Sequence, residues 1–142
     1  MSGPAQGWLP HQLSFTTPSS SSTTFVVPAY DVWYVQSIRV SYTSTSTAGN
    51  RQLTIERLND AGTVLGSIKA GVTQAESLTY TYEFSPGLND LTSLRYTTNL
   101  TTPLPNWYLS PGWSLKIYDI AAIAASADSM TIYATVLKAN LC

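Results

Sequence analysis

The 142-residue sequence carries very little charge. Seven basic and eight acidic residues make up 11% of the chain, which leaves a net charge of −1. An ordinary globular domain is about 25% charged. No basic stripe is present to neutralise phosphates, so we expect no nucleic-acid partner. Because charged residues are depleted and aromatic residues enriched at interface centres, this composition favours a protein that packs against neighbouring proteins.

Cysteine and histidine are almost absent. Cys142 is the one cysteine, so neither an internal disulfide nor a cysteine metal site is possible. We expect an incidental thiol at this position, with a link between two chains as the alternative. His11 is the one histidine, and it lies beside Pro10 in a segment too irregular to orient a general base. A Ser-His-Asp centre is therefore not expected.

Long apolar runs are absent too. No stretch approaches the roughly 20 apolar residues of a membrane span, so we expect no membrane partner. Residues 1–10 lack the basic and apolar regions of a signal peptide, so we expect synthesis in the cytoplasm without export by the usual route. Helical periodicity is equally scarce, which argues against βαβ folds. The alanine-rich segment 120–128 is the one candidate for a helical turn or two.

The sequence does contain period-two alternation, which is typical of half-buried strands. In residues 32–42 the even positions are predicted to share one face, and Asn59-Asp60-Ala61-Gly62 is typical of a hairpin turn. Strands are expected from residue 25 onward, at 32–42, 52–58, 63–69, 78–84, 94–98, 113–119 and 130–136. Segment 102–105 holds two prolines and is expected to be extended and unpaired. The pattern predicts an all-β, antiparallel β-sandwich, jelly-roll-like, of about eight strands.

The first residues are predicted to lie outside this sandwich. Glycine and proline recur through residues 1–10, and a Ser/Thr run follows at 18–24. We therefore assign residues 1–24 to an extended N-terminal arm and Ser/Thr-rich loop, and 25–142 to the β-sandwich domain. Because terminal arms are ordered only when tied down, we expect a neighbouring chain to hold this arm, with residues 3–15 acting as a clasp.

The carboxylates do not form a recognisable catalytic or metal-binding pattern. Asp119 and Asp128 bracket the alanine-rich segment and could approach each other or a cation. We prefer the interpretation that Asp119 ends a strand and Asp128 shapes a turn. No calcium loop, phosphate-binding glycine loop or metal-ligand spacing is present. We therefore predict no catalytic residues, no cofactor and no metal, and hence no enzyme.

The aromatic residues are the remaining candidates for a site. Four tryptophans and nine tyrosines bring the aromatic content to 11%. Exposed rings could stack on sugars, which predicts that Trp107 and Trp113 flank a solvent-facing groove; the alternative is that most rings fill the core or contact other subunits. Trp107 and Trp113 stand next to prolines at expected loop ends. The predicted interface anchors are Trp8, Leu9, Phe15, Trp107 and Trp113.

Several segments resemble small β-proteins encoded among the structural genes of tailed bacteriophages. The matching segments are 49–53 (GNRQL), 70–79 (AGVTQAESLT), 84–88 (FSPGL), 100–105 (LTTPLP), 109–119 (LSPGWSLKIYD) and 127–131 (ADSMT). Together they span roughly residues 36–137, and the arm lies outside them.

The resemblance implies a virion structural protein of the decoration (cement) type. Such a protein would be located on the capsid surface, contact the major capsid protein or other virion proteins, and form a homo-oligomer, with a trimer favoured. The alternative is a neck, tail or fibre component that acts as a glycan- or receptor-binding module.

Overall fold

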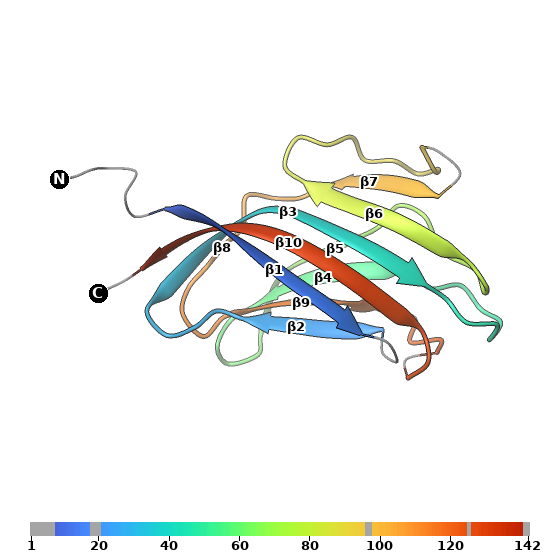
Figure 1. The fold of residues 1–142 in the computed structure, drawn as a ribbon, viewed down its shortest axis with the longest axis horizontal. Helices are drawn as coiled ribbons and strands as arrows, with labels where there is room; N and C mark the ends of the chain where they lie inside the picture. The colour runs from blue at the N-terminus through green and yellow to red at the C-terminus, as the bar shows by residue number, and fades with distance from the viewer. Residues whose placement is uncertain (1–7, 18–20, 96–97, 125, 141–142) are drawn as a thin grey trace.

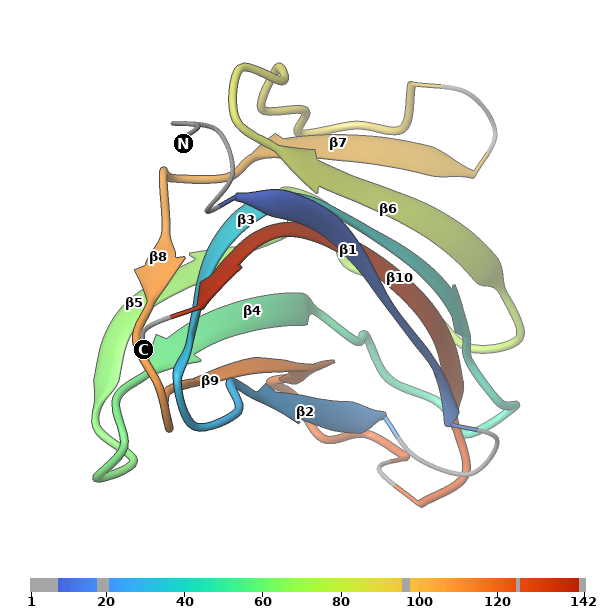
Figure 2. The same ribbon diagram turned by 60° about the vertical axis from the view of Figure 1, so that its left-hand side comes forward.

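The computed structural model describes residues 8–17, 21–95, 98–124 and 126–140, with only the backbone described at 15–17. The described residues form strands, turns and loops without a helix. Two sheets face each other (Figures 1 and 2). The six-stranded sheet runs β1 (Leu9–Thr17), β10 (Ser129–Asn140), β3 (Asp31–Thr43), β6 (Thr79–Ser85), β7 (Asn99–Pro103), with β8 (Tyr108–Leu109) also paired to β3. The four-stranded sheet runs β2 (Ser22–Val26), β9 (Ser114–Asp119), β4 (Leu53–Leu58), β5 (Val64–Lys69).

The strand pairs are nested, which confirms the predicted jelly-roll-like sandwich. β1 pairs with β10, β2 with β9, β3 with β6 and β4 with β5, all antiparallel. This is the pattern of one long hairpin rolled into two sheets. The structure adds two short strands, β7 and β8, between β6 and β9, so the described chain has ten strands rather than about eight. β7 is also an exception to the antiparallel rule, because it runs parallel to β6.

The N-terminal segment differs from the prediction. Residues 9–17 form edge strand β1, which pairs along its whole length with β10, and residues 22–26 form β2 in the other sheet. Pro10 is tolerated because an edge strand needs fewer backbone donors. The described part of the predicted arm is therefore held by its own chain, and residues 1–7 lie outside the described residues.

A β-bulge divides β3 into two halves, and the side chains that face the core are at odd positions in the first half and at even positions in the second. Ser37 pairs with Thr135 and Val35 with Val136, so Gln36 has no partner on β10. The extra residue exchanges the inward and outward positions of the strand. Beyond the bulge the predicted even positions are buried, but before it the odd positions Trp33 and Val35 are buried. Tyr34 consequently faces outward.

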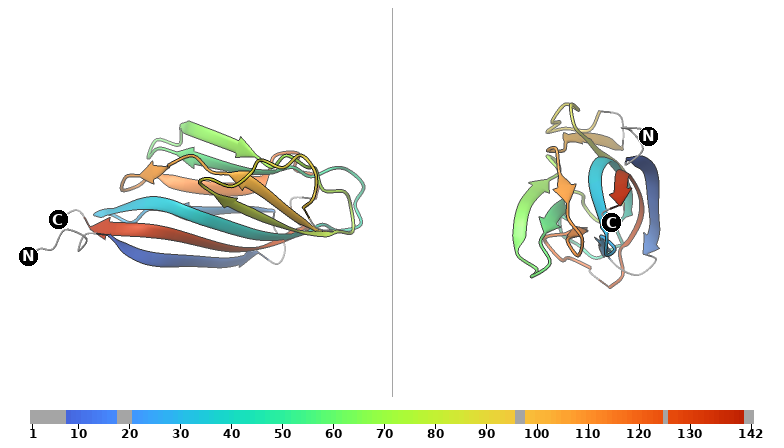
Figure 3. Two further views of the ribbon diagram at one scale, coloured as in Figure 1. Left: turned by 90° about the horizontal axis from the view of Figure 1, so that it is seen from above. Right: turned by 90° about the vertical axis from the view of Figure 1, so that its left-hand side faces the viewer.

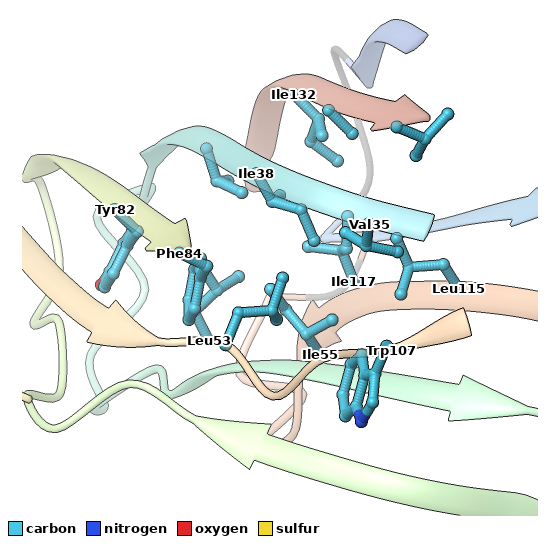
Figure 4. Close-up of a cluster of buried hydrophobic side chains, with 14 of the residues drawn as sticks. Val35, Ile38, Leu53, Ile55, Tyr82, Phe84, Trp107, Leu115, Ile117 and Ile132 are labelled. Carbon is cyan, nitrogen blue, oxygen red and sulfur yellow. The ribbon is translucent and has the colours of Figure 1, made fainter. Parts of the chain in front are cut away.

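The core lies between the two sheets (Figures 3 and 4). The six-stranded sheet contributes fully buried aliphatic and aromatic side chains, among them Val35, Ile38, Val40, Phe84 and Ile132. The four-stranded sheet contributes Leu53, Ile55, Leu115 and Ile117. Apart from Val35, which lies before the bulge, these residues stand at alternating positions of their strands, as expected for side chains that face one side of a sheet.

Three local predictions are corrected by the structure. The described part of 94–98 is not a strand, and the strand in this region is β7. Pro103 does belong to a strand, at the edge of the sheet opposite Ser85. The described residues of 120–128 form turns rather than a helix, in which the N–H groups of Ala127 and Asp128 donate to the carbonyl of Ala124.

Candidate interaction surface

Exposed large hydrophobic side chains gather at one end of the sandwich. Ten such side chains occur among the described residues, and seven of them lie where β1, β3 and β5 begin and β2 and β10 end. We call this set the apolar end, and it consists of Trp8, Leu9, Val26, Tyr30, Val64, Leu65 and Tyr108. The other three, Leu78, Ile120 and Tyr133, lie elsewhere.

Strand register brings these residues to the same end. In the four-stranded sheet, Val26 pairs with Ser114, which pairs with Leu58, which pairs with Val64. The turn that carries Tyr30 then connects β2 to the start of β3 (Figure 1). Isolated exposed hydrophobic residues are ordinary, whereas grouped ones mark interaction sites. The apolar end is therefore the strongest candidate surface for a partner.

Part of the apolar end is a pocket with aromatic walls. We call it the aromatic pocket; it is lined by Trp8, Tyr34, Tyr108 and Leu137 and has a volume of about 370 Å³. Tyr34 and Tyr108 stack with ring centroids 4.7 Å apart and an interplanar angle of 30°. Trp8 stands at 70° to Tyr108, with centroids 6.2 Å apart. Two of the walls thus meet nearly at a right angle.

Hydrogen bonds hold two of these walls in place. The Tyr34 hydroxyl donates to Asn106 Oδ1 at 3.0 Å, and Arg57 Nη1 donates to the backbone carbonyl of Tyr108 at 3.2 Å. The backbone of Tyr108 is also paired with Tyr34 across β8 and β3. Tyr34, Tyr108 and Leu137 of the aromatic pocket therefore lie on strands, and Trp8 directly precedes β1.

A second cavity of about 390 Å³ lies further along the six-stranded sheet. Its lining includes Tyr133 and the ion pair between Arg39 Nη1 and Glu83 Oε1, which are 3.2 Å apart. This pair is exposed to solvent, so the cavity differs from the aromatic pocket in carrying both charges.

The predicted anchors Trp107 and Trp113 are not solvent-facing. Trp107 is 4% exposed and belongs to the core, where it packs so closely on Gly66 that an added Cβ would lie 3.0 Å from its ring. Trp113 is half-buried and packs against the core. The Arg57 guanidinium carbon lies 5.7 Å from the Trp107 ring centroid and 5.8 Å from that of Trp113. These two indoles therefore lie within cation–π distance of the half-buried Arg57 side chain.

Two of the predicted anchors in the N-terminal segment are exposed, unlike Trp107. Trp8 and Leu9 are exposed and belong to the apolar end. Phe15 lies on β1 opposite Ile132, and its side chain is outside the described residues, as is Cys142. His11 is exposed on β1.

The opposite end of the sandwich holds a buried polar network centred on Asp128. Asp128 is fully buried and accepts hydrogen bonds from Arg51 Nε (2.9 Å), Arg51 Nη2 (3.2 Å) and the Tyr42 hydroxyl (2.8 Å). It also accepts from the backbone N–H and the hydroxyl of Thr45. Arg51 is 1% exposed and uses Nη1 to donate to the carbonyls of Thr47 and Gly49. The network ties the β3–β4 connection to the start of β10.

The pKa values in this network follow from burial and charge. Burial alone raises the pKa of Asp128, but the hydrogen bonds from Arg51, Thr45 and Tyr42 outweigh it and leave the pKa below its usual value. The hydrogen bond to Asp128 raises the pKa of Arg51. Burial, reinforced by Asp128, raises the pKa of Tyr42 well above its ordinary value. The pair is therefore ionised and the phenol neutral at physiological pH.

A second buried carboxylate, Asp119, ends β9 as predicted. It accepts from the backbone N–H groups of Gln52, Ala121 and Ile123 at 2.9, 2.9 and 3.1 Å. The preferred interpretation of Asp119 is therefore confirmed. Asp128 was expected to shape a turn, but its carboxylate binds Arg51, Tyr42 and Thr45, and the turn before it is closed by backbone hydrogen bonds to Ala124. Within the described residues, no three His, Cys, Asp or Glu side chains are grouped so that they could hold a metal ion.

Sequence reasoning missed Tyr34, Tyr108 and Leu137 of the aromatic pocket, and Arg51 of the polar network. Tyr34 was missed because the bulge at Gln36 gives no signal in alternation. Arg51 stands next to a Gly-Asn turn, where an exposed arginine is the ordinary expectation. Nothing local to the sequence pairs it with Asp128, which is 77 positions away.

Comparisons with known proteins give distant likenesses. No protein-family model and no curated protein matches the chain. Among solved structures, it is similar to a chain of Bacillus endospore appendages, described as disulfide-linked pili (10% identity, TM-score 0.39, 100% of this chain and 98% of that one). It is also similar to a chain of infectious bursal disease virus, Gx strain (9% identity, TM-score 0.36, 94% of this chain and 37% of that one). The T=1 particles derived from infectious bursal virus give 10% identity and a TM-score of 0.33, over 93% of this chain and 40% of that one.

The chain thus spans less than half the length of these viral proteins. At such identities and TM-scores the likenesses carry no argument about function. None of the described residues forms a helix with the length and hydrophobicity needed to cross a membrane.

Proposed function

We propose that this chain is a non-enzymatic structural protein of a virion, which binds and stabilises the exterior of the assembled capsid. The observation that carries the proposal is the apolar end, where seven of the ten exposed large hydrophobic side chains of the described residues gather. Low charge and the resemblance to small β-proteins among phage structural genes support it. The partner is the major capsid protein or another virion protein, and the chain acts as a homo-oligomer, with a trimer favoured.

The proposed mechanism is stabilisation by mass action. A protein that binds the assembled shell but not its separated subunits raises the free energy needed to open the shell. A specific contact buries about 800 Å² on each partner, so the apolar end would form the centre of a larger interface. Many symmetry-related copies, linked as oligomers, would increase the occupancy of each site through avidity.

The first test is the copy number of this chain in purified virions, measured by quantitative mass spectrometry against the major capsid protein. Decoration of a symmetric shell requires on the order of one copy per capsid subunit. A copy number far below that would contradict decoration and assign the chain to the neck, tail or fibres.

A pair of matched variants tests the apolar end itself. Leu65 and Leu78 are 39% and 37% exposed, and only Leu65 belongs to the apolar end. Leu65→Asp should abolish binding to undecorated capsids, because a charge would be desolvated at the contact. Leu78→Asp should bind as the unaltered chain does. Equal binding by both variants would remove the apolar end from the interface.

A second candidate is a neck, tail or fibre component that binds a glycan or receptor. The predicted form of this function is wrong, because it requires a solvent-facing Trp107 and the Trp107 side chain is buried in the core. The observation that supports glycan binding is the aromatic pocket, which has the exposed side chains of Trp8 and Tyr108 in its lining. A low copy number in virions together with glycan binding would favour this candidate.

A further inference from the structure

We propose that the aromatic pocket formed by Trp8, Tyr34, Tyr108 and Leu137 binds one ring of a neutral saccharide. Aromatic faces attract the C–H groups on the faces of pyranose rings through dispersion and the ring quadrupole. Trp8 and Tyr108 stand at 70° to each other. A sugar ring stacked on one wall therefore brings its edge to the other, which fixes its orientation in the corner.

The charge of the lining selects a neutral ligand. Trp8, Tyr34, Tyr108 and Leu137 include no ionised side chain, and no pair of charges lines the pocket. Asp31 and Lys138 flank the strand ends at this end of the molecule, but they pair with each other, with Nζ and Oδ2 3.8 Å apart. An anionic or cationic ligand would lose its hydration in this pocket without gaining a counter-charge.

The hydrogen bond between Tyr34 and Asn106 leaves polar groups that match the hydroxyls of a sugar. The Tyr34 hydroxyl is engaged with Asn106 Oδ1, which leaves its oxygen lone pairs as acceptors and the Asn106 amide N–H groups as donors. The Tyr108 side chain is more than half exposed. An apolar floor and walls with a few oriented polar groups at the rim is the usual composition of a small-molecule site.

Size and rigidity favour a ring-sized ligand over a protein segment. The pocket volume of about 370 Å³ is at the lower end of the range for ligand sites, roughly 300–1,000 Å³. Four side chains line it, whereas a protein partner alone would need about 800 Å² of contact. The Tyr34 side chain is already held by its hydrogen bond to Asn106 and by stacking on Tyr108, so this wall loses little side-chain entropy on binding.

This inference deepens the second candidate function, glycan binding, by naming its site and ligand class, and it does not depend on capsid binding. Capsid binding uses the wider apolar end, and it is tested by the copy number in virions and by the binding of Leu65→Asp to undecorated capsids. Saccharide binding is read from the isolated chain, so either proposal can fail while the other stands.

The test is a titration of the isolated full chain followed by NMR at the tryptophan indole N–H groups. Trp8 is the one clearly exposed tryptophan, since Trp33 and Trp107 are buried and Trp113 is half-buried. The probes are a set of neutral oligosaccharides, including maltotriose, chitotriose and a galactose-containing trisaccharide, with oligoproline as a non-saccharide ligand that also stacks on aromatic residues. The expected result is a saturable shift of the Trp8 indole signal by at least one saccharide, with a Kd of about 1 mM or tighter.

Variants assign the response to the pocket. Trp8→Ala and Leu137→Arg should each weaken saccharide binding about tenfold or more, the first by removing a wall and the second by filling the corner with a charge. Tyr133→Ala is the control matched to Trp8→Ala, because Tyr133 is 47% exposed against 39% for Trp8 but lines the other cavity. It should bind as the unaltered chain does.

Three results would overturn the proposal. They are no Trp8 shift with any saccharide, a shift with oligoproline alone, and a loss of binding in Tyr133→Ala that equals the loss in Leu137→Arg. Circular dichroism of each variant confirms that the sheets are intact, and Leu137→Arg remains a test should Trp8→Ala disturb the start of β1.

Discussion

Replacing Asp128 with asparagine should destabilise the fold more than any other single conservative polar change in the described residues. The substitution keeps the shape of the side chain but leaves the Arg51 cation, which is 1% exposed, without a counter-charge. Breaking a buried pair in this way costs about 3–5 kcal/mol. Domains of this kind are stable by roughly 5–15 kcal/mol in total, so the loss would be a large fraction of the stability. A decrease in Tm of about 10 °C or more is expected.

The assay is urea unfolding at pH 7, followed by circular dichroism. Glu83→Gln is the control, because its pair with Arg39 is exposed and should contribute about 0.5 kcal/mol or less. Arg51→Met combined with Asp128→Asn should cost less than the sum of the two single changes, by about 1 kcal/mol or more, since the two side chains share one interaction. A loss below about 1 kcal/mol for Asp128→Asn would refute the assignment of the pair as a buried structural interaction.

The same pair makes a prediction about pH. The pKa of Asp128 is lower in the folded chain than its ordinary value, so the folded state binds fewer protons in acid than the unfolded chain. The contribution of Asp128 is therefore complete above the unfolded pKa of about 4 and is lost as the pH falls through the folded pKa. The difference in unfolding free energy between the unaltered chain and Asp128→Asn should shrink between pH 6 and about pH 3. A constant difference would show that the charge of Asp128 does not stabilise the fold.

Other predictions concern two glycines and the hydrogen bond between the Tyr118 hydroxyl and Glu56. Gly71→Ala should cost about 1–3 kcal/mol in urea unfolding, because the added Cβ would lie 2.2 Å from the backbone oxygen of Leu91. At Gly62 an added Cβ meets open space, so Gly62→Ala should cost about 1 kcal/mol from the positive φ of 84° alone. A larger loss of stability for Gly62→Ala than for Gly71→Ala would contradict the close approach at Gly71. Burial, and then the 2.6 Å hydrogen bond to Glu56, raises the pKa of Tyr118 to about 12. Glu56→Gln should lower this pKa in an ultraviolet absorbance titration, and an unchanged midpoint would remove Glu56 as a cause.

The fold was predictable from the sequence where alternation and turns agree. The spacing of two residues correctly predicts which side chains are buried in β4 and β9, namely Leu53 and Ile55, and Leu115 and Ile117. Successive side chains of a strand point to opposite faces of the sheet, so residues two apart share one face. The N-terminal segment was assigned to an arm because proline and glycine argue against a central strand. They do not argue against an edge strand, and that is the position β1 takes.

The candidate surface was less predictable than the fold. Trp8 and Leu9 were identified, but Tyr108 and Val64 were not, because their gathering depends on register between strands distant in sequence. Trp107 was assigned to the surface from its neighbouring prolines, whereas its indole packs on Gly66, a residue 41 positions earlier. Single-strand patterns report which side chains face inward and carry no information about which strand ends meet.

The nested pairing has a consequence for how the chain acquires its structure. The two latest strands of the chain, β9 and β10, occupy interior positions, β10 between β1 and β3 and β9 between β2 and β4. During synthesis, β1, β2 and one edge of both β3 and β4 therefore have no partner until β9 and β10 have left the ribosome. Such non-local pairing is slow and leaves strand edges open to other chains. The nascent chain is for this reason most vulnerable to misassociation just before β9 and β10 emerge.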